Sequence, residues 1–151
     1  MDDKTITFAL DKSRVLETVF ALSAMRTYHR DAPRPLGRDE TPALMKLMEG
    51  AAANVMTQLL QHVADADIRG DDIISLTLRV PHGVEVTVSQ QIVMGVKLEE
   101  AVALGVLELA FDAVCPAASA QASQRSIAAV REIAAVLEAC PDGLRLAPCP
   151  W

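Results

Sequence analysis

The chain has 151 residues, of which 51% are apolar and 3% aromatic, and its 20 acidic and 14 basic side chains give a formal charge of −6. A chain of this length buries about two thirds of its surface on folding, enough for one core without metals or disulfides. The apolar content excludes an intrinsically disordered chain. The acidic, aromatic-poor composition argues against a binder of single-stranded nucleic acid, which needs a basic groove with stacking aromatic side chains.

The N-terminus is acidic and polar, starting Met1-Asp2-Asp3-Lys4, and lacks the features of a secretory or transit leader. The longest apolar stretches, Ile92–Val96 and Ala101–Leu107, are far shorter than the ~20 residues that span a membrane. We therefore expect no membrane partner, and a location in the cytoplasm or, on the hypothesis below, in a virion.

Two segments alternate between apolar and polar residues with the period of a half-buried strand. In Thr5–Leu10 the even-numbered residues are apolar, and the same holds for Ile74–Val80. A lone strand leaves its backbone groups unpaired, so each segment needs a partner. Antiparallel pairing of the two segments within one chain is the simplest solution, and pairing between subunits is the alternative.

Apolar residues at three- and four-residue spacing predict four helices. The first runs from an Asp11 N-cap to about His29, and the second runs from a Thr41 cap, followed by proline, to about Asp65. The expected connections are a loop over 31–40 and a turn over 67–72. The third and fourth helices are expected at about 88–114 and 119–139. The predicted fold is α+β and predominantly helical, one domain over 1–143 with a small antiparallel β element, followed by a proline-rich tail over 144–151.

The third helix is apolar almost all round, which is typical of a central core helix or a subunit interface. Gly95 and Gly105 within it predict close helix contacts, since glycine costs about 1 kcal/mol against alanine there. Its start is ambiguous: the alternating residues 84–88 fit either a strand or an extended entry to the helix, and Thr87 with Gln90 fits a capping box. The predicted buried line of the fourth helix is Ile127, Val130, Ala134 and Leu137.

The strongest electrostatic feature is a group of four arginines near the end of the first helix: Arg26, Arg30, Arg34 and Arg38. Asp31 is the one acidic residue among them. A solvated loop explains this group, because cations are favoured at a helix C-terminus. The alternative is a docking site for an acidic partner or a nucleic-acid backbone, since phosphate contacts need arginines without base-reading residues. Trp151, at the end of the proline-rich tail, is a further candidate partner-binding residue, as part of an arm inserted into a neighbouring subunit.

Motifs for catalysis or cofactor binding are absent from the sequence, so we expect no enzyme, cofactor or metal. Asp65–Asp71 begins like a calcium loop, but Arg69 and Leu76 occupy positions that need oxygen ligands. The three histidines and three cysteines have no metal-ligand spacing. They are His29, His62, His82, Cys115, Cys140 and Cys149. Reduced cysteines are expected, with a Cys140–Cys149 disulfide as the alternative.

The order of elements resembles small uncharacterised proteins of Bacteroidales-type prophage gene clusters. The matching pieces are Thr5–Asp11, Asp39-Glu40 before an alanine-rich helix, Asp71-Asp72 before the strand that ends at Pro81, and the two closing helices. The resemblance covers most of the chain at the level of pattern. It implies a virion or tail-assembly component of the head–tail junction type that works in a ring, and it carries over no catalytic residues.

We therefore expect a non-enzymatic structural or assembly protein that acts as a homo-oligomer with other assembly proteins. Two unpartnered strands and a widely apolar helix are the features that oligomer interfaces use. The alternative is a bacterial cytoplasmic regulatory module with a small apolar ligand cavity between its helices.

Overall fold

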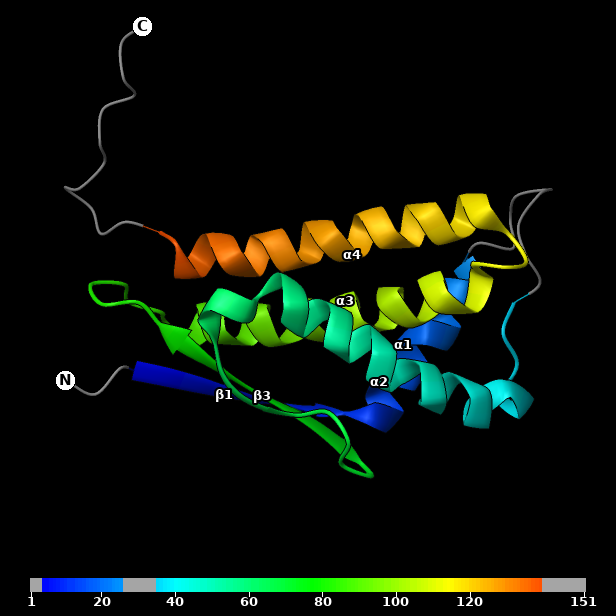
Figure 1. Ribbon diagram of the computed structural model, residues 1–151, viewed down its shortest axis with the longest axis horizontal. Coiled ribbons are helices and arrows are strands. Elements are labelled where there is room, and N and C mark those ends of the chain that lie inside the picture. Colours follow the sequence, from blue (N-terminus) through cyan, green and yellow to red (C-terminus); the bar gives the residue numbers. More distant parts are fainter. Residues whose placement is uncertain (1–3, 26–34, 140–151) are drawn as a thin grey trace, which may run out of the picture.

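The computed structural model describes residues 4–25 and 35–139 (Figure 1). Four helices pack together above a small sheet. This arrangement confirms the predicted α+β, mainly helical fold. The strands are β1 (Lys4–Asp11), β2 (Val63–Asp67) and β3 (Ile73–Val80). The helices are α1 (Lys12–Met25), α2 (Thr41–Gln58), α3 (Val88–Phe111) and α4 (Pro116–Leu137), with single 3-10 turns η2 (Arg38–Glu40) and η3 (Leu60–His62).

The two predicted strands pair as expected within one chain. β1 and β3 are antiparallel over eight residues each, with Lys4 opposite Val80 and Asp11 opposite Ile73. The even-numbered side chains Phe8 and Leu10 are buried, and the odd-numbered ones face solvent, so the alternation in the sequence matches the two faces of the sheet.

A third strand corrects the predicted course of the second helix. α2 ends at Gln58, not near Asp65, and the chain turns through η3 into β2, which pairs antiparallel with β3. The apolar residues keep their helical spacing through Leu59, which is buried, and Val63, which is half-buried. The end of the helix therefore cannot be located from the apolar pattern. The start of α2 also differs: Thr41 lies inside the helix and its hydroxyl donates to the Arg38 carbonyl, at 2.7 Å, in place of capping.

α3 is the central element of the fold. Figure 1 shows α4 packed along one side of it, α2 in front, α1 behind and the sheet beneath. Every residue from Ala101 to Leu107 is buried, which is why this stretch is apolar on all sides. Gly105 confirms the predicted close helix contact, because a Cβ there would lie 3.0 Å from the Ala51 Cβ of α2. Gly95 instead faces the Phe8 ring of β1.

The start of α3 resolves the ambiguity over residues 84–88. The Thr87 hydroxyl accepts the Gln90 N–H at 3.1 Å, and the Gln90 side chain accepts the Thr87 N–H at 2.9 Å. This reciprocal capping box confirms a helix entry, and residues 84–87 form no strand. The helix ends at Phe111, three residues before the predicted Val114.

The fourth helix begins at Pro116 and buries only part of the predicted line. Val130 and Leu137 are buried as expected, Ala134 is half-buried, and Ile127 is 36% exposed. Small residues take its place against α3: the Ser126 hydroxyl donates to the Ala101 carbonyl at 2.9 Å, and the Ser119 hydroxyl donates to the Glu108 carbonyl at 2.9 Å. Small buried residues let α3 and α4 approach closely. The prediction, based on large apolar side chains, did not include these small residues.

The two glycines at the α2–α3 contact predict different responses to alanine. We expect Gly50→Ala to raise the free energy of unfolding by about 0.5–1 kcal/mol, because helix propensity improves and the new Cβ meets only the Leu109 side chain at 3.6 Å. At Gly105 the new Cβ would crowd Ala51 at 3.0 Å, so Gly105→Ala should give no such gain. Urea unfolding of both variants checks the contrast, and an equal gain at the two positions would contradict it.

Candidate interaction surface

The predicted basic group falls mostly outside the described residues. Arg26, Arg30, Arg34 and Trp151 lie outside them, as does the predicted end of the first helix near His29. Arg38 is in η2, where its 82% exposed side chain pairs with Glu17 of α1 at 3.5 Å. Docking of an acidic partner or of a nucleic-acid backbone by the four arginines therefore stays a prediction.

β1 forms one edge of the sheet, whose strand order is β1-β3-β2. The Lys12 N–H donates to the Asp72 carbonyl at 2.9 Å and extends the β1–β3 ladder by one pair. Hydrogen-bonded pairs alternate along an antiparallel ladder, so the even-numbered residues of β1 bond to β3. The N–H and C=O groups of Thr5, Thr7 and Ala9 then point away from β3, and within the described residues no strand pairs with them.

This edge lacks the features that usually protect an edge strand. Thr5 to Leu10 contains no charged residue and no proline, and the β1–β3 register is regular over the whole strand. Natural edge strands are commonly interrupted by charge, proline or a bulge, because a long regular edge templates pairing with another strand. Among the residues that the structure describes, β1 therefore offers an open site for strand addition.

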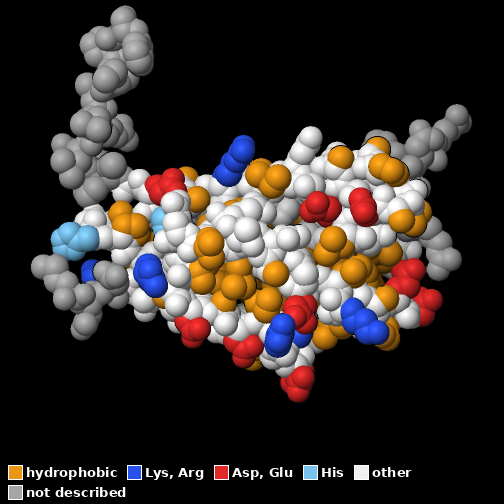
Figure 2. Space-filling view, viewed as in Figure 1, with side chains coloured by type: hydrophobic (Ala, Val, Ile, Leu, Met, Phe, Trp, Pro, Cys, Tyr) orange, Lys and Arg blue, Asp and Glu red, His pale blue; other side chains and the backbone are white. Residues whose placement is uncertain are grey.

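The opposite edge of the sheet is protected. β2 has five residues, two of them the aspartates Asp65 and Asp67, and its register with β3 shifts between Val63 and Asp65. Figure 2 shows acidic side chains at the lower edge of the molecule, where Figure 1 places the turn between β2 and β3. A short, irregular and acidic strand disfavours pairing with another strand, so the β2 edge is protected and the β1 edge is not.

A row of exposed aliphatic side chains lies on the first half of α3. Val88, Ile92 and Val96 recur every four residues and are 74%, 64% and 58% exposed. Single exposed aliphatic residues are ordinary, but three on one helix face form a continuous apolar strip. Three residues after Val96, α1 covers α3 at Glu99: the Thr18 hydroxyl donates to the Glu99 carboxylate at 3.1 Å, and Arg14 pairs with it at 3.7 Å.

The exposed row of α3 adjoins the open edge of β1. Gly95, between Ile92 and Val96, rests on the Phe8 ring, so α3 packs against β1 at this point. A groove of about 420 Å³ between the start of β1 and the start of α3 is lined by Thr5 and Gln91, among other residues. We call the outward edge of β1 together with Val88, Ile92 and Val96 the β1/α3 face.

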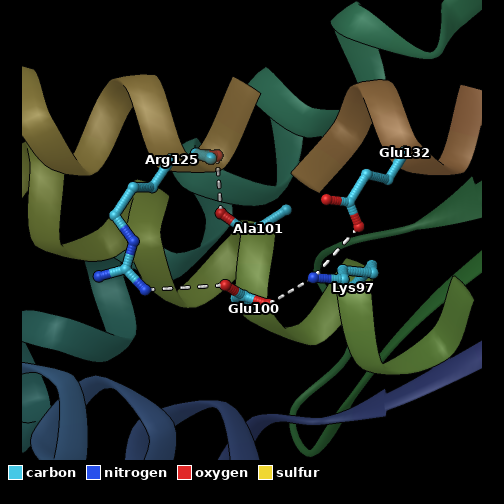
Figure 3. Close-up of polar contacts among 6 residues, drawn as sticks. Lys97, Glu100, Ala101, Arg125 and Glu132 are labelled. Carbon is cyan, nitrogen blue, oxygen red and sulfur yellow. Dashed lines mark hydrogen bonds and ion pairs between the residues drawn. The ribbon is translucent and has the colours of Figure 1, made fainter. Parts of the chain in front are cut away.

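A polar network on another side of α3 joins it to α4 (Figure 3). Lys97 pairs with Glu132 at 3.2 Å and with Glu100 at 3.5 Å, and Arg125 pairs with Glu100 at 3.8 Å. The hydrogen bond to Glu132 and the nearby Glu100 charge raise the pKa of Lys97 above its ordinary value, against a smaller opposing effect of burial. All four charged groups have a partner, so the network positions α4 and leaves no charge directed at a ligand.

The raised pKa of Lys97 gives a pH-dependent prediction. A lysine whose pKa is higher in the folded state stabilises the fold below its unfolded pKa of 10.5, and this contribution is lost as pH rises through the folded value. We expect Lys97→Met to cost less than about 1 kcal/mol at neutral pH, since the pairs are partly exposed. Unfolding measured at pH 7 to 11 should show wild type and variant converging above pH 10.5. A constant difference at all pH values would contradict this account.

His62 forms a second polar cluster, between η3 and the end of α4. It lies in η3, off the second helix on which the sequence pattern placed it, and is 7% exposed. Its Nε2 is 3.3 Å from the Glu138 carboxylate, which also accepts the Gln61 amide at 3.0 Å. A groove of about 410 Å³ there also contacts Arg79. The cluster ties the end of α4 to η3.

The described residues contain no group of three or more histidine, cysteine, aspartate or glutamate side chains that could hold a metal ion. Asp65 and Asp67, the start of the calcium-like segment, belong to β2. Cys115 is half-buried and free, and the alternative Cys140–Cys149 disulfide lies outside the described residues. Of the described helices, none has the length and hydropathy required to cross a membrane.

Comparisons of the chain with protein-family models, with curated proteins and with solved structures gave no match.

Proposed function

We propose that this chain is a non-enzymatic assembly protein that acts as a homo-oligomer through its β1/α3 face. The observation that carries the proposal is the open, uncharged edge of β1 beside the exposed row Val88, Ile92 and Val96. Each feature alone is an ordinary site of protein contact, and the contact of Gly95 with Phe8 brings the unpaired backbone groups of one near the apolar side chains of the other.

The type of assembly rests on the sequence resemblance to prophage proteins. On that basis we propose a virion component of the head–tail connector or tail-assembly type, made in the cytoplasm and working with other assembly proteins. The four arginines, of which Arg38 is described, are proposed to contact an acidic partner or a nucleic-acid backbone in that assembly.

The alternative of a regulatory module with an apolar ligand cavity has less support. The apolar cavity between α2, α3 and the sheet, lined among others by Leu10, Val55 and Leu98, measures about 10 Å³. That is room for about one water molecule, whereas small-molecule pockets are about 300–1,000 Å³.

Sedimentation velocity of the full chain from 1 to about 100 μM tests the proposal, since specific homo-oligomers commonly form in this range. We expect a concentration-dependent shift from monomer to a defined oligomer that persists when the salt concentration is raised, because the face is uncharged. A monomer throughout this range would contradict the proposed function.

A further inference from the structure

We propose that the β1/α3 face joins two copies of this chain around a two-fold axis, with β1 of one copy antiparallel to β1 of the other. The inference rests on the proposed self-association and goes beyond it, because it commits to the partner, the strand direction and the register. The two three-stranded sheets then form one continuous sheet of six strands.

The backbone groups of β1 set the register. Thr5, Thr7 and Ala9 present the outward N–H and C=O groups, so these residues form the hydrogen-bonded pairs of any added antiparallel strand. A two-fold axis at Thr7 places Thr7 opposite Thr7 of the second copy and Thr5 opposite Ala9. The side chains of all three lie on the solvent face of the sheet. In this register the core-facing side chains of the two strands therefore lie on the same face of the joined sheet.

The charges at the two ends of β1 favour the antiparallel direction. Lys4 is the one cation of the strand and Asp11 the one anion, and they lie at opposite ends. Antiparallel pairing centred on Thr7 places Lys4 of each copy opposite Leu10 of the other, whereas parallel pairing in register would place Lys4 opposite Lys4 and Asp11 opposite Asp11. Between these ends the strand is uncharged, so two copies that each carry a formal −6 can meet there without direct repulsion.

The same axis brings the exposed rows of the two α3 helices together. Paired strands lie about 4.8 Å apart and α3 packs on β1 at Phe8, so this axis brings the first halves of the two α3 helices beside one another. Val88, Ile92 and Val96 of each copy then lie against the same row of the other. An isologous contact of this kind covers both parts of the face at once, whereas an extended peptide on the β1 edge would leave much of the row exposed.

Opposite charges introduced at Thr7 test the register directly. Thr7→Lys and Thr7→Glu each place like charges opposite one another at the axis, so each variant alone should raise the dimer dissociation constant about tenfold or more. An equimolar mixture of the two should restore dimerisation to within about threefold of wild type, because lysine then faces glutamate.

Thr77→Lys is the matched control. It adds the same charge on the same face of the sheet, one strand further from the axis, and it removes the same 2.9 Å contact between the Thr7 and Thr77 hydroxyls. We expect it to leave the dissociation constant within about threefold of wild type, and circular dichroism checks that all variants are folded.

The outcomes separate the two proposals. A wild-type chain that stays monomeric overturns the proposed function and this inference with it. A wild-type oligomer that neither Thr7 variant weakens, or whose weakening the mixture does not reverse, leaves the proposed function standing and overturns the two-fold β1 pairing.

Discussion

Leu104→Ala is expected to lower the free energy of unfolding by about 2–5 kcal/mol, because the leucine is fully buried in the central helix and the surrounding structure can close the cavity only in part. α3 contacts α1, α2, α4 and β1, so a cavity in its centre weakens several contacts at once. Urea unfolding followed by circular dichroism measures the loss. Wild type and variant are compared at one protein concentration, because self-association adds to apparent stability.

Leu109→Ala on the same helix is the matched control. Leu109 is 36% exposed, so the same substitution removes less buried surface and should cost about 1 kcal/mol or less. Equal losses at the two positions would contradict the assignment of α3 as the central core helix.

Ile92→Asp is expected to raise the dissociation constant of the oligomer about 100-fold, because it places two like charges in an apolar contact with no partner for either. Ile92 is 64% exposed in the isolated chain, so the free energy of unfolding of the monomer should change by no more than about 0.5 kcal/mol. Sedimentation velocity measures the first quantity, and urea unfolding at low protein concentration measures the second.

Leu60→Asp controls for a general effect of exposed apolar residues. Leu60 is 67% exposed and lies in η3, next to the opposite edge of the sheet. It should leave the oligomer unchanged. If Leu60→Asp dissociates the oligomer and Ile92→Asp does not, association uses a different surface from the β1/α3 face.

Patterns confined to one segment predicted much of the fold. β1 and β3 follow from their strict alternation, and the start of α3 follows from the Thr87–Gln90 capping box, because both depend on neighbouring residues. The fully apolar stretch of α3 indicated a central helix for the same reason. Each of these signals is carried by the residues that form the element.

Features that depend on distant partners were missed. β2 has the sequence VADAD, with little strand propensity, and exists because β3 offers its second edge. The hydrogen bonds of Ser119 and Ser126 to α3 carbonyl groups set the buried face of α4. In this orientation Ile127 is partly exposed to solvent. Strand order decides which edge stays open, so the β1/α3 face could be predicted only in outline, as a strand and an apolar helix in need of partners.

Hydrogen exchange of single β1 amides, followed by NMR at low and high protein concentration, tests the central claim most directly. The outward amides of Thr5, Thr7 and Ala9 should exchange rapidly in the dilute monomer and become protected as the concentration rises. The amides of Ile6 and Phe8, bonded to β3, should be protected at both concentrations and serve as the internal reference. Exchange at Thr7 that stays rapid in a sample shown to be oligomeric would contradict the assignment of the β1/α3 face as the surface of self-association.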